Sequence, residues 1–204
     1  MRVKFCGLTK AEDIATANEL EPDYVGFVFY KKSKRYLSPE KALELRQRLS
    51  EKIKVVGVFV DEELDTVAKL LEENVIDIAQ LHGAEDEEYI ASLKSLSKKP
   101  VIKAFCIKEK ADLDKAENSG ADGILLDAGM GDGILFNWEL LKGFIRPYFL
   151  AGGLDCENVR AAAGLKPFAV DVSSGIETDN RKDPEKMRRF MKAVREINGG
   201  TKDE

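Results

Sequence analysis

Short apolar segments alternate with longer amphipathic segments along the whole chain, and this alternation restricts the fold more than any other feature. It predicts strand–helix units on a parallel sheet, because two parallel strands need a crossover connection, which is usually a helix. Eight segments have the length and composition of buried strands: 3–6, 24–29, 54–60, 76–81, 100–105, 123–127, 148–151 and 168–172. Seven intervals predict helices: 10–20, 41–49, 64–73, 85–96, 110–119, 156–163 and 184–197.

Eight such units fit either an open doubly wound sheet or a closed barrel. Regular repetition without a domain-like insertion favours the barrel, and 204 residues lie at the small end of what closes one. We therefore predict an α/β fold, a single-domain (β/α)8 TIM barrel over residues 1–204, with a frayed tail at 198–204. Glycines in the long interval 127–138 predict a lid beside the barrel rim.

Composition excludes several classes of protein. A net charge of −5 argues against a nucleic-acid partner, and the basic cluster at 31–35 is the only one of its kind. No apolar run reaches the roughly 18 residues of a membrane span, and the N-terminus lacks the regions of a secretory signal. We therefore expect a cytoplasmic protein with no membrane partner. Three widely spaced cysteines and one histidine predict neither a disulfide framework nor a metal site.

Polar side chains and glycines follow several of the predicted strands, which is where a barrel displays its functional groups. Cys6 ends the first strand and Asp127 ends the sixth. Side chains two residues apart on a strand share a face, so Lys4 aligns with Cys6 and Gln80 with His82. We expect Cys6 and Asp127 to face each other across the mouth of the barrel.

Cys6 taken alone is a residue type that is most often inert and buried. Its position raises the odds of reactivity, because a helix beginning near Thr9 offers amide donors and a positive dipole end that lower a thiol pKa. Cys106 also follows a strand and is a competing candidate, whereas Cys156 lies in the first turn of a predicted helix, where Asp155 is the expected cap.

Two aspartates stand where ligand contacts are expected. Asp127 is either a turn former or a general acid, and the second role requires burial or a neighbouring anion to keep it protonated near pH 7. Asp171 lies inside the last strand, where an unpaired carboxylate is costly, so we expect a hydrogen bond to Lys4 or to a ligand hydroxyl.

Glycines and serines after the last two strands match the phosphate site that barrels build there. Paired glycines at 152 and 153 let the backbone approach a phosphate closely, and Ser173 and Ser174 add hydroxyl donors. Arg35 is either exposed to solvent or a planar fork for a substrate carboxylate. His82 is expected to stack on a ligand or to hydrogen-bond it.

With these motifs in place, the chain resembles the phosphoribosylanthranilate isomerase family of tryptophan biosynthesis over almost its whole length. Seven segments in order carry the resemblance: Val3–Thr9, Gly26–Phe29, Ser33–Arg35, Gln80–Gly83, Leu125–Asp127, Ala151–Leu154 with Glu157–Val159, and Asp171–Glu177. The resemblance implies an Amadori rearrangement of N-(5-phosphoribosyl)anthranilate to 1-(2-carboxyphenylamino)-1-deoxyribulose 5-phosphate. It implies no metal and no organic cofactor, a phosphosugar amine as the only small-molecule partner, and a monomer or a homodimer.

The resemblance also assigns roles residue by residue. Asp127 matches the general acid that opens the furanose ring, and Cys6 matches the base that removes the C2 proton. Arg35 matches the residue that binds the anthranilate carboxylate. Phosphate-cradle positions match Gly152, Gly153, Ser173 and Ser174, and pocket-lining positions match Gln80, His82 and Asp171.

The chain departs from the family pattern in one loop, and other readings stay open. Asp132 stands where the family usually has serine or threonine, and Asn137 replaces a common aspartate. The related aminoaldose isomerase of histidine biosynthesis uses two aspartates, which disagrees with Cys6. Indole-glycerol-phosphate synthase requires catalytic lysines, for which Lys4 and Lys103 are candidates, but its longer N-terminal extension is missing. A non-catalytic phosphosugar-binding barrel is the alternative outside enzymes.

Overall fold

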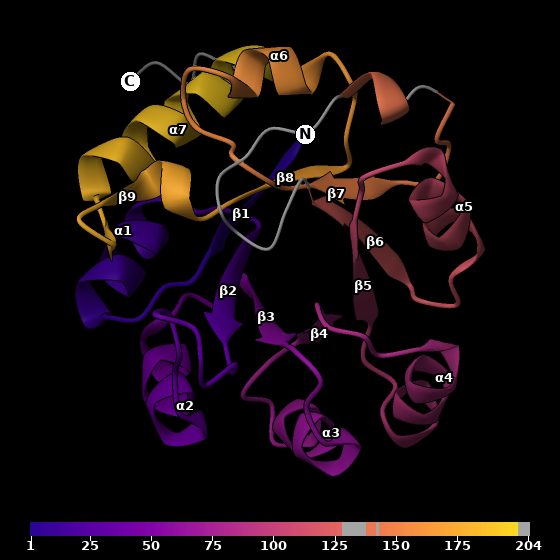
Figure 1. Ribbon diagram of the computed structural model, residues 1–204. Helices are drawn as coiled ribbons and strands as arrows, with labels where there is room; N and C mark the ends of the chain where they lie inside the picture. Colours follow the sequence, from indigo (N-terminus) through magenta and orange to yellow (C-terminus); the bar gives the residue numbers. More distant parts are fainter. Residues whose placement is uncertain (128–137, 142, 200–204) are drawn as a thin grey trace.

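Eight parallel strands close into a barrel in chain order, so that β8 pairs with β1. The computed structural model describes residues 1–127, 138–141 and 143–199. Figure 1 shows the strands around the centre and the helices outside them. Closure confirms the predicted (β/α)8 barrel over the open sheet. The strands are β1 (Arg2–Cys6), β2 (Tyr24–Val28), β3 (Lys54–Phe59), β4 (Ile78–Leu81), β5 (Val101–Cys106), β6 (Gly123–Asp127), β7 (Tyr148–Leu150) and β8 (Ala169–Val172).

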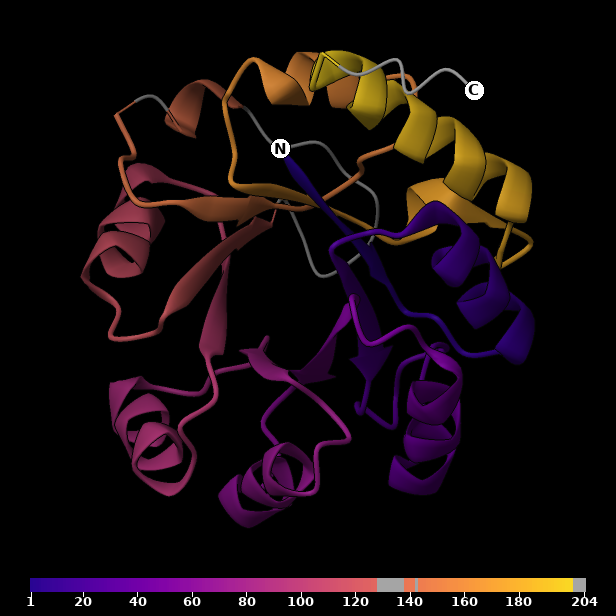
Figure 2. The ribbon, with the colours of Figure 1, turned by 180° about the vertical axis from the view of Figure 1, so that it is seen from behind.

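Each of the seven intervals predicted as helical contains a helix. Ser38 and Asp183 cap two of them with their side chains, and in each case proline occupies the first helical position. In Figure 2 the last helix lies between the first helix and the sixth, which completes the outer layer. The helices are α1 (Ala11–Leu20), α2 (Pro39–Arg48), α3 (Leu64–Glu72), α4 (Glu87–Leu96), α5 (Lys110–Asn118), α6 (Val159–Ala163) and α7 (Pro184–Ile197).

Four helices begin at a residue other than the predicted one: α1 one residue later, α2 two residues earlier, α4 two residues later and α6 three residues later. At α1, the Asp13 carboxylate accepts hydrogen bonds from the amides of Thr9 and Lys10 at 2.8 and 3.0 Å, which makes Lys10 the N-cap residue and Ala11 the first helical residue. Asp155 accepts from the amides at 157 and 158 and forms a turn, which delays α6 to Val159. In both places an aspartate side chain accepts hydrogen bonds from backbone amides that precede the helix.

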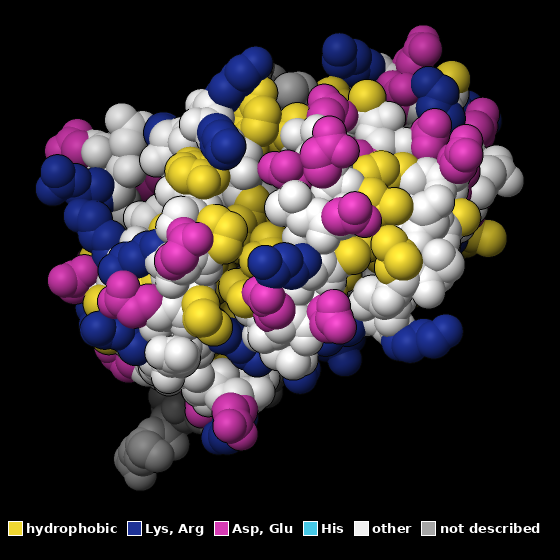
Figure 3. All heavy atoms as spheres, turned by 90° about the horizontal axis from the view of Figure 1, so that it is seen from below, with side chains coloured by type: hydrophobic (Ala, Val, Ile, Leu, Met, Phe, Trp, Pro, Cys, Tyr) yellow, Lys and Arg dark blue, Asp and Glu magenta, His cyan; other side chains and the backbone are white. Residues whose placement is uncertain are grey.

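Apolar side chains form two layers. One lies between the strands and the helices, and a second fills the barrel interior with Ile102, Ala104, Leu125, Phe149, Ala151 and Ala169. Alternation along the strands then sends polar side chains into the interior one layer above, where Lys4, Gln80, Asp127 and Asp171 are all buried. Among the described residues no helix is long and apolar enough to cross a membrane. On the face shown in Figure 3, acidic and basic side chains are interspersed.

A small hairpin follows β8 that the sequence analysis did not predict. A 3-10 turn, η2 (Ser174–Ile176), leads into β9 (Glu177–Thr178), which pairs antiparallel with β10 (Arg181–Lys182). Asp179 and Asn180 connect the two strands with positive φ angles of 51° and 60°. The segment between β6 and β7 has a second 3-10 turn, η1 (Trp138–Leu141). The expected lid, with Asp132 and Asn137, lies outside the described residues, as does 200–204 of the expected tail, whereas Asn198 hydrogen-bonds Met1.

Candidate active site

All ten residues singled out from the sequence line one cavity at the carboxyl ends of the strands. Apolar side chains at 28, 58, 60, 151 and 154 and the Tyr30 ring form the rest of its wall, with Ser33. The ten are Cys6, Arg35, Gln80, His82, Asp127, Gly152, Gly153, Asp171, Ser173 and Ser174. One cavity therefore combines a thiol, carboxylates, an imidazole and glycine turns, which come from strands all around the barrel.

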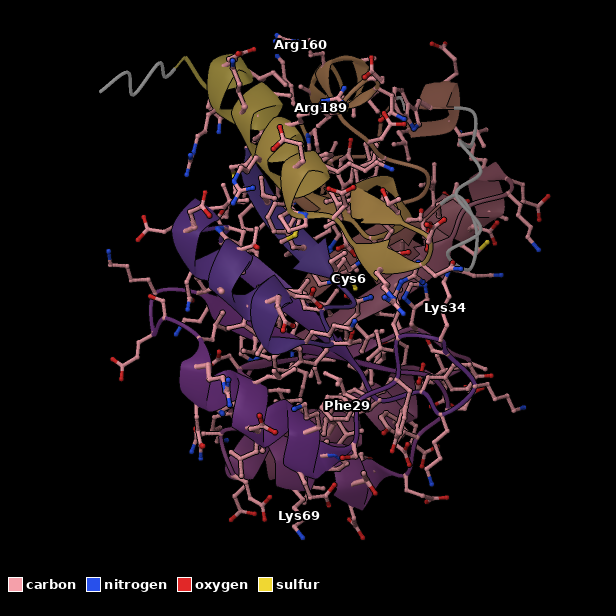
Figure 4. The ribbon with its side chains drawn as sticks, turned by 90° about the vertical axis from the view of Figure 1, so that its left-hand side faces the viewer. Cys6, Phe29, Lys34, Lys69, Arg160 and Arg189 are labelled. Carbon is pink, nitrogen blue, oxygen red and sulfur yellow. The ribbon has the colours of Figure 1, made fainter. Side chains whose placement is uncertain are left out.

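Cys6 ends β1 directly beside Gly26 of β2, its partner in the strand register. A Cβ atom on Gly26 would lie 2.7 Å from the Cys6 sulfur, closer than side-chain atoms approach. Glycine at 26 therefore leaves the space that the thiol occupies. Figure 4 shows Cys6 at the end of its strand, with the yellow hairpin next to it.

The expectation that a helix N-terminus lowers the Cys6 pKa is wrong. Burial raises the pKa of the thiol, and the charge of Asp171 adds to this increase, while the charges of Lys4 and Lys182 oppose it. The amides that follow the strand do not reach the sulfur, because those of Gly7 and Leu8 donate to the Gly26 carbonyl. Lysine side chains, not a helix dipole, favour the thiolate here.

Lys4 and Asp171 form a buried ion pair on the cavity floor, with 2.9 Å between Nζ and Oδ2. The predicted hydrogen bond of Asp171 is thus confirmed. Its second oxygen, Oδ1, is buried and has no hydrogen-bond partner among the described residues. Because Asp171 lines the cavity, this acceptor is available to a ligand hydroxyl.

Gln80, His82 and Asp127 form a chain across the opposite wall. The Gln80 amide nitrogen lies 3.0 Å from His82 Nδ1, and His82 Nε2 lies 3.3 Å from Asp127 Oδ2. With this amide orientation the Gln80 NH2 donates, so Nδ1 accepts and Nε2 carries the proton that faces Asp127. The Asp127 carboxyl, 4% exposed, therefore has a fixed orientation at the end of β6.

Arg35 is neither free in solvent nor fully available to a ligand. Its Nε and Nη2 donate hydrogen bonds to the two oxygens of Glu177 at 2.6 and 2.7 Å. The aliphatic part of the Arg35 side chain packs on Gly7, where a Cβ atom added to the glycine would lie 2.3 Å from Arg35 Cδ. Gly7 has a φ of 78°, which favours glycine, so it serves both the turn and the passage of Arg35. The Nη1 and Nη2 edge of the guanidinium remains for a second carboxylate.

The glycine turn after β7 and the serine turn after β8 lie against each other. Gly152 and Gly153 have φ angles of 92° and 62°, and Asn158 holds the first turn by donating to the Gly153 carbonyl at 2.8 Å. A Cβ on Gly175 would lie 1.9 Å from the Leu154 carbonyl oxygen, so the two turns meet only because residue 175 is glycine. Backbone amides in such turns form anion-binding concavities.

Sequence reasoning missed two charged residues beside the cavity, Glu177 and Lys182, because it missed the hairpin that carries them. The signal was present in Asp179–Asn180, a residue pair that favours positive φ in two-residue hairpin loops. The competing thiol Cys106 ends β5 and is exposed, and it does not belong to the lining of the cavity. No group of three or more His, Cys, Asp or Glu side chains in the described ranges is placed to bind a metal ion.

Comparisons with known proteins agree on one family. The family model for N-(5'-phosphoribosyl)anthranilate (PRA) isomerase matches residues 3–193. A protein of that name from Thermoanaerobacter sp. is 45% identical, over 97% of this chain and 99% of its own length. A phosphoribosyl anthranilate isomerase in complex with reduced 1-(o-carboxyphenylamino)-1-deoxyribulose 5-phosphate superposes with a TM-score of 0.86 at 38% identity, covering 96% and 99% of the two chains. A structure described as mutually generated monomers of the dimeric isomerase from Thermotoga maritima gives the same values.

Proposed function

This chain belongs to the N-(5'-phosphoribosyl)anthranilate isomerase family, and from that premise we propose that Cys6 is its general base and Asp127 its general acid. The protein is an isomerase of tryptophan biosynthesis. The assignment of its two proton carriers is supported by their placement in one cavity, at the ends of β1 and β6. These are the positions at which barrel enzymes carry catalytic groups.

Asp127 begins the reaction by giving its proton to the furanose ring oxygen, and the ring opens to a Schiff base. The Cys6 thiolate then takes the C2 proton, which leaves an enolamine. Tautomerisation to the ketone adds one proton to C1 and releases one from the C2 oxygen, so the substrate and the product contain the same atoms. His82 contributes to the first step by positioning the Asp127 carboxyl group, since its Nε2 lies 3.3 Å from Asp127 Oδ2.

The remaining cavity residues bind the two ends of the substrate. The turns at Gly152–Gly153 and Ser173–Ser174 take the phosphate, since their glycine backbone allows close approach. Arg35 takes the anthranilate carboxylate on the edge that Glu177 leaves available. Apolar residues at 28, 58 and 60 pack on the aromatic ring, and Asp171 Oδ1 accepts a ribose hydroxyl.

One observation carries the proposal beyond family membership. The cavity lining combines a thiol at the end of β1 and a carboxyl group at the end of β6 with the glycine and serine turns and the Arg35 guanidinium. An anionic phosphosugar amine therefore fits between two proton carriers. A barrel that only binds phosphosugars would need the cradle without this pair.

The test is the loss of anthranilate-type fluorescence from freshly made phosphoribosylanthranilate. The wild type should consume it rapidly, whereas Asp127→Asn and Cys6→Ala should be slower by about 10² or more, the usual contribution of a positioned acid or base. Cys106→Ala is the matched control and should keep the wild-type rate, because Cys106 lies outside the cavity lining. If Asp127→Asn kept turnover within about threefold, the assigned acid would be wrong.

Two further expectations belong to this proposal. Residues 1–204 act as one catalytic unit, in a protein that is cytoplasmic. One chain supplies both proposed proton carriers and the two turns proposed for the phosphate. We expect a monomer or a homodimer.

A further inference from the structure

Glu177 joins two cations at the edge of the cavity. Its oxygens accept from Arg35 at 2.6 and 2.7 Å, and Oε1 also accepts from Lys182 at 2.7 Å. The Lys182 side chain is 2% exposed and that of Glu177 is 6% exposed. These three residues, called the hairpin cluster below, carry one negative and two positive charges in a largely dry location.

Lys182 also contacts the backbone next to the thiol. Its ammonium donates to the Ser173 carbonyl at 2.9 Å and lies 3.3 Å from the Ser173 hydroxyl. That hydroxyl donates in turn to the carbonyl of Cys6 at 3.1 Å. The β9–β10 hairpin thus brings Lys182 to the end of β1 through Ser173, although the two residues lie far apart in the sequence.

The charges that face Cys6 come from four residues. Lys4 of β1 hydrogen-bonds Cys6 and lowers the pKa of the thiol more than Lys182 does. However, Lys4 is also paired with Asp171 of β8, whose charge raises that pKa, so the pair is neutral overall. Lys182 of β10 and Arg35 of the loop after β2 share the single carboxylate of Glu177. The hairpin cluster therefore supplies the net positive charge near the thiol. Burial also lowers the pKa of Lys182, and the anions Glu177 and Cys6 counteract this.

Building on the proposed function, we infer that Lys182 is a positioning residue of the reaction: its ammonium holds the thiolate of Cys6, and Glu177 holds Lys182. The hairpin thereby links the base to Arg35 and to the serine of the phosphate cradle. Removal of Lys182 leaves the neutral Lys4–Asp171 pair beside a buried thiol. The thiolate then becomes less stable, and the base is in its inactive form at neutral pH.

The test measures the alkylation rate of each cysteine by iodoacetamide as a function of pH, with peptide mass spectrometry. In Lys182→Met the midpoint for Cys6 should rise by about one pH unit or more, which makes alkylation about tenfold slower at neutral pH. Lys182→Arg keeps the charge and should restore most of the effect. Lys186→Met is the matched control, because Lys186 also anchors the hairpin, through the Glu177 carbonyl at 2.7 Å. An unchanged Cys6 midpoint in Lys182→Met would overturn the inference.

A second measurement does not use Lys182→Met and therefore holds even if that variant does not fold. With 13C-labelled lysine, the Lys182 Cε signal, identified by its loss in Lys182→Arg, should shift at the pH at which Cys6 ionises. This pH-dependent shift of the Lys182 signal should be absent in Cys6→Ser. A wild-type Lys182 signal that does not shift at the pH of Cys6 ionisation would contradict the inference.

Turnover separates this inference from the proposed function. Wild-type turnover in Cys6→Ala would refute Cys6 as the base and, with it, the role of Lys182 in the reaction. Loss of turnover in Cys6→Ala together with an unchanged alkylation midpoint in Lys182→Met would leave the proposed function standing and refute the inference alone.

Discussion

Glu177→Gln should lower the free energy of unfolding at neutral pH, and this difference from the wild type should become smaller in acid. Arg35 and Lys182 lower the pKa of the Glu177 carboxyl from its usual 4.5 to about 2, against the opposing effect of burial. A group with a lowered native pKa stabilises the fold above its unfolded pKa, and this contribution disappears as the pH falls toward the native pKa. The difference of ~2.5 pH units corresponds to ~3 kcal/mol in full, at ~1.4 kcal/mol per unit. About 2 kcal/mol of this stabilisation should be lost by pH 3, because at that pH the Glu177 carboxyl is protonated mainly in the unfolded protein.

Urea unfolding of both proteins at pH 7, 5, 4 and 3 measures this effect directly. The free-energy difference between wild type and Glu177→Gln should shrink by about 2 kcal/mol from pH 7 to pH 3, because a protonated glutamate resembles glutamine. Other carboxyl groups titrate in both proteins and cancel. Glu51→Gln, at an exposed turn, is the control and should differ from wild type by a constant amount. A pH-independent difference for Glu177→Gln would refute the electrostatic account of the hairpin cluster.

Three further substitutions test the site. Gly26→Ala should lower kcat at least tenfold with an unchanged circular dichroism spectrum, because its Cβ would lie 2.7 Å from the Cys6 sulfur; unchanged kcat would contradict the packing argument. Gly175→Ala should weaken inorganic phosphate binding at least tenfold in calorimetry, since it separates two turns that meet at the Leu154 carbonyl; wild-type affinity would show that these turns are not the cradle. Arg35→Lys should raise KM about tenfold and change kcat less, because lysine lacks the planar guanidinium that binds a carboxylate through two hydrogen bonds. A lower kcat with an unchanged KM would contradict the proposed role of Arg35 in binding the substrate carboxylate.

The candidate site was predictable because strand ends in a parallel barrel converge. Once eight strands were placed, Cys6 and Asp127 had to lie on the same rim, and alternation sent both inward. The cost of a lone buried carboxylate predicted a hydrogen bond of Asp171 to Lys4 or to a ligand hydroxyl, and the structure shows the bond to Lys4. The amides of Thr9 and Lys10, which were expected near the thiol, instead donate to Asp13 in the first turn of α1, a side-chain contact that the pattern of strands and helices does not reveal.

The alternation of apolar and amphipathic segments, with caps at residues such as Ser38 and Asp183, was enough to determine the fold class and the order of its elements. These features are local, since strand and helix periods are visible in the residues themselves. Which charged side chains lie near Cys6 was decided only by the tertiary structure. Glu177 pairs with Arg35, 142 residues away in the chain, and Lys182 reaches the end of β1 through Ser173. The pKa of a buried group depends on which charges surround it in space, and only closure of the barrel brings those charges together.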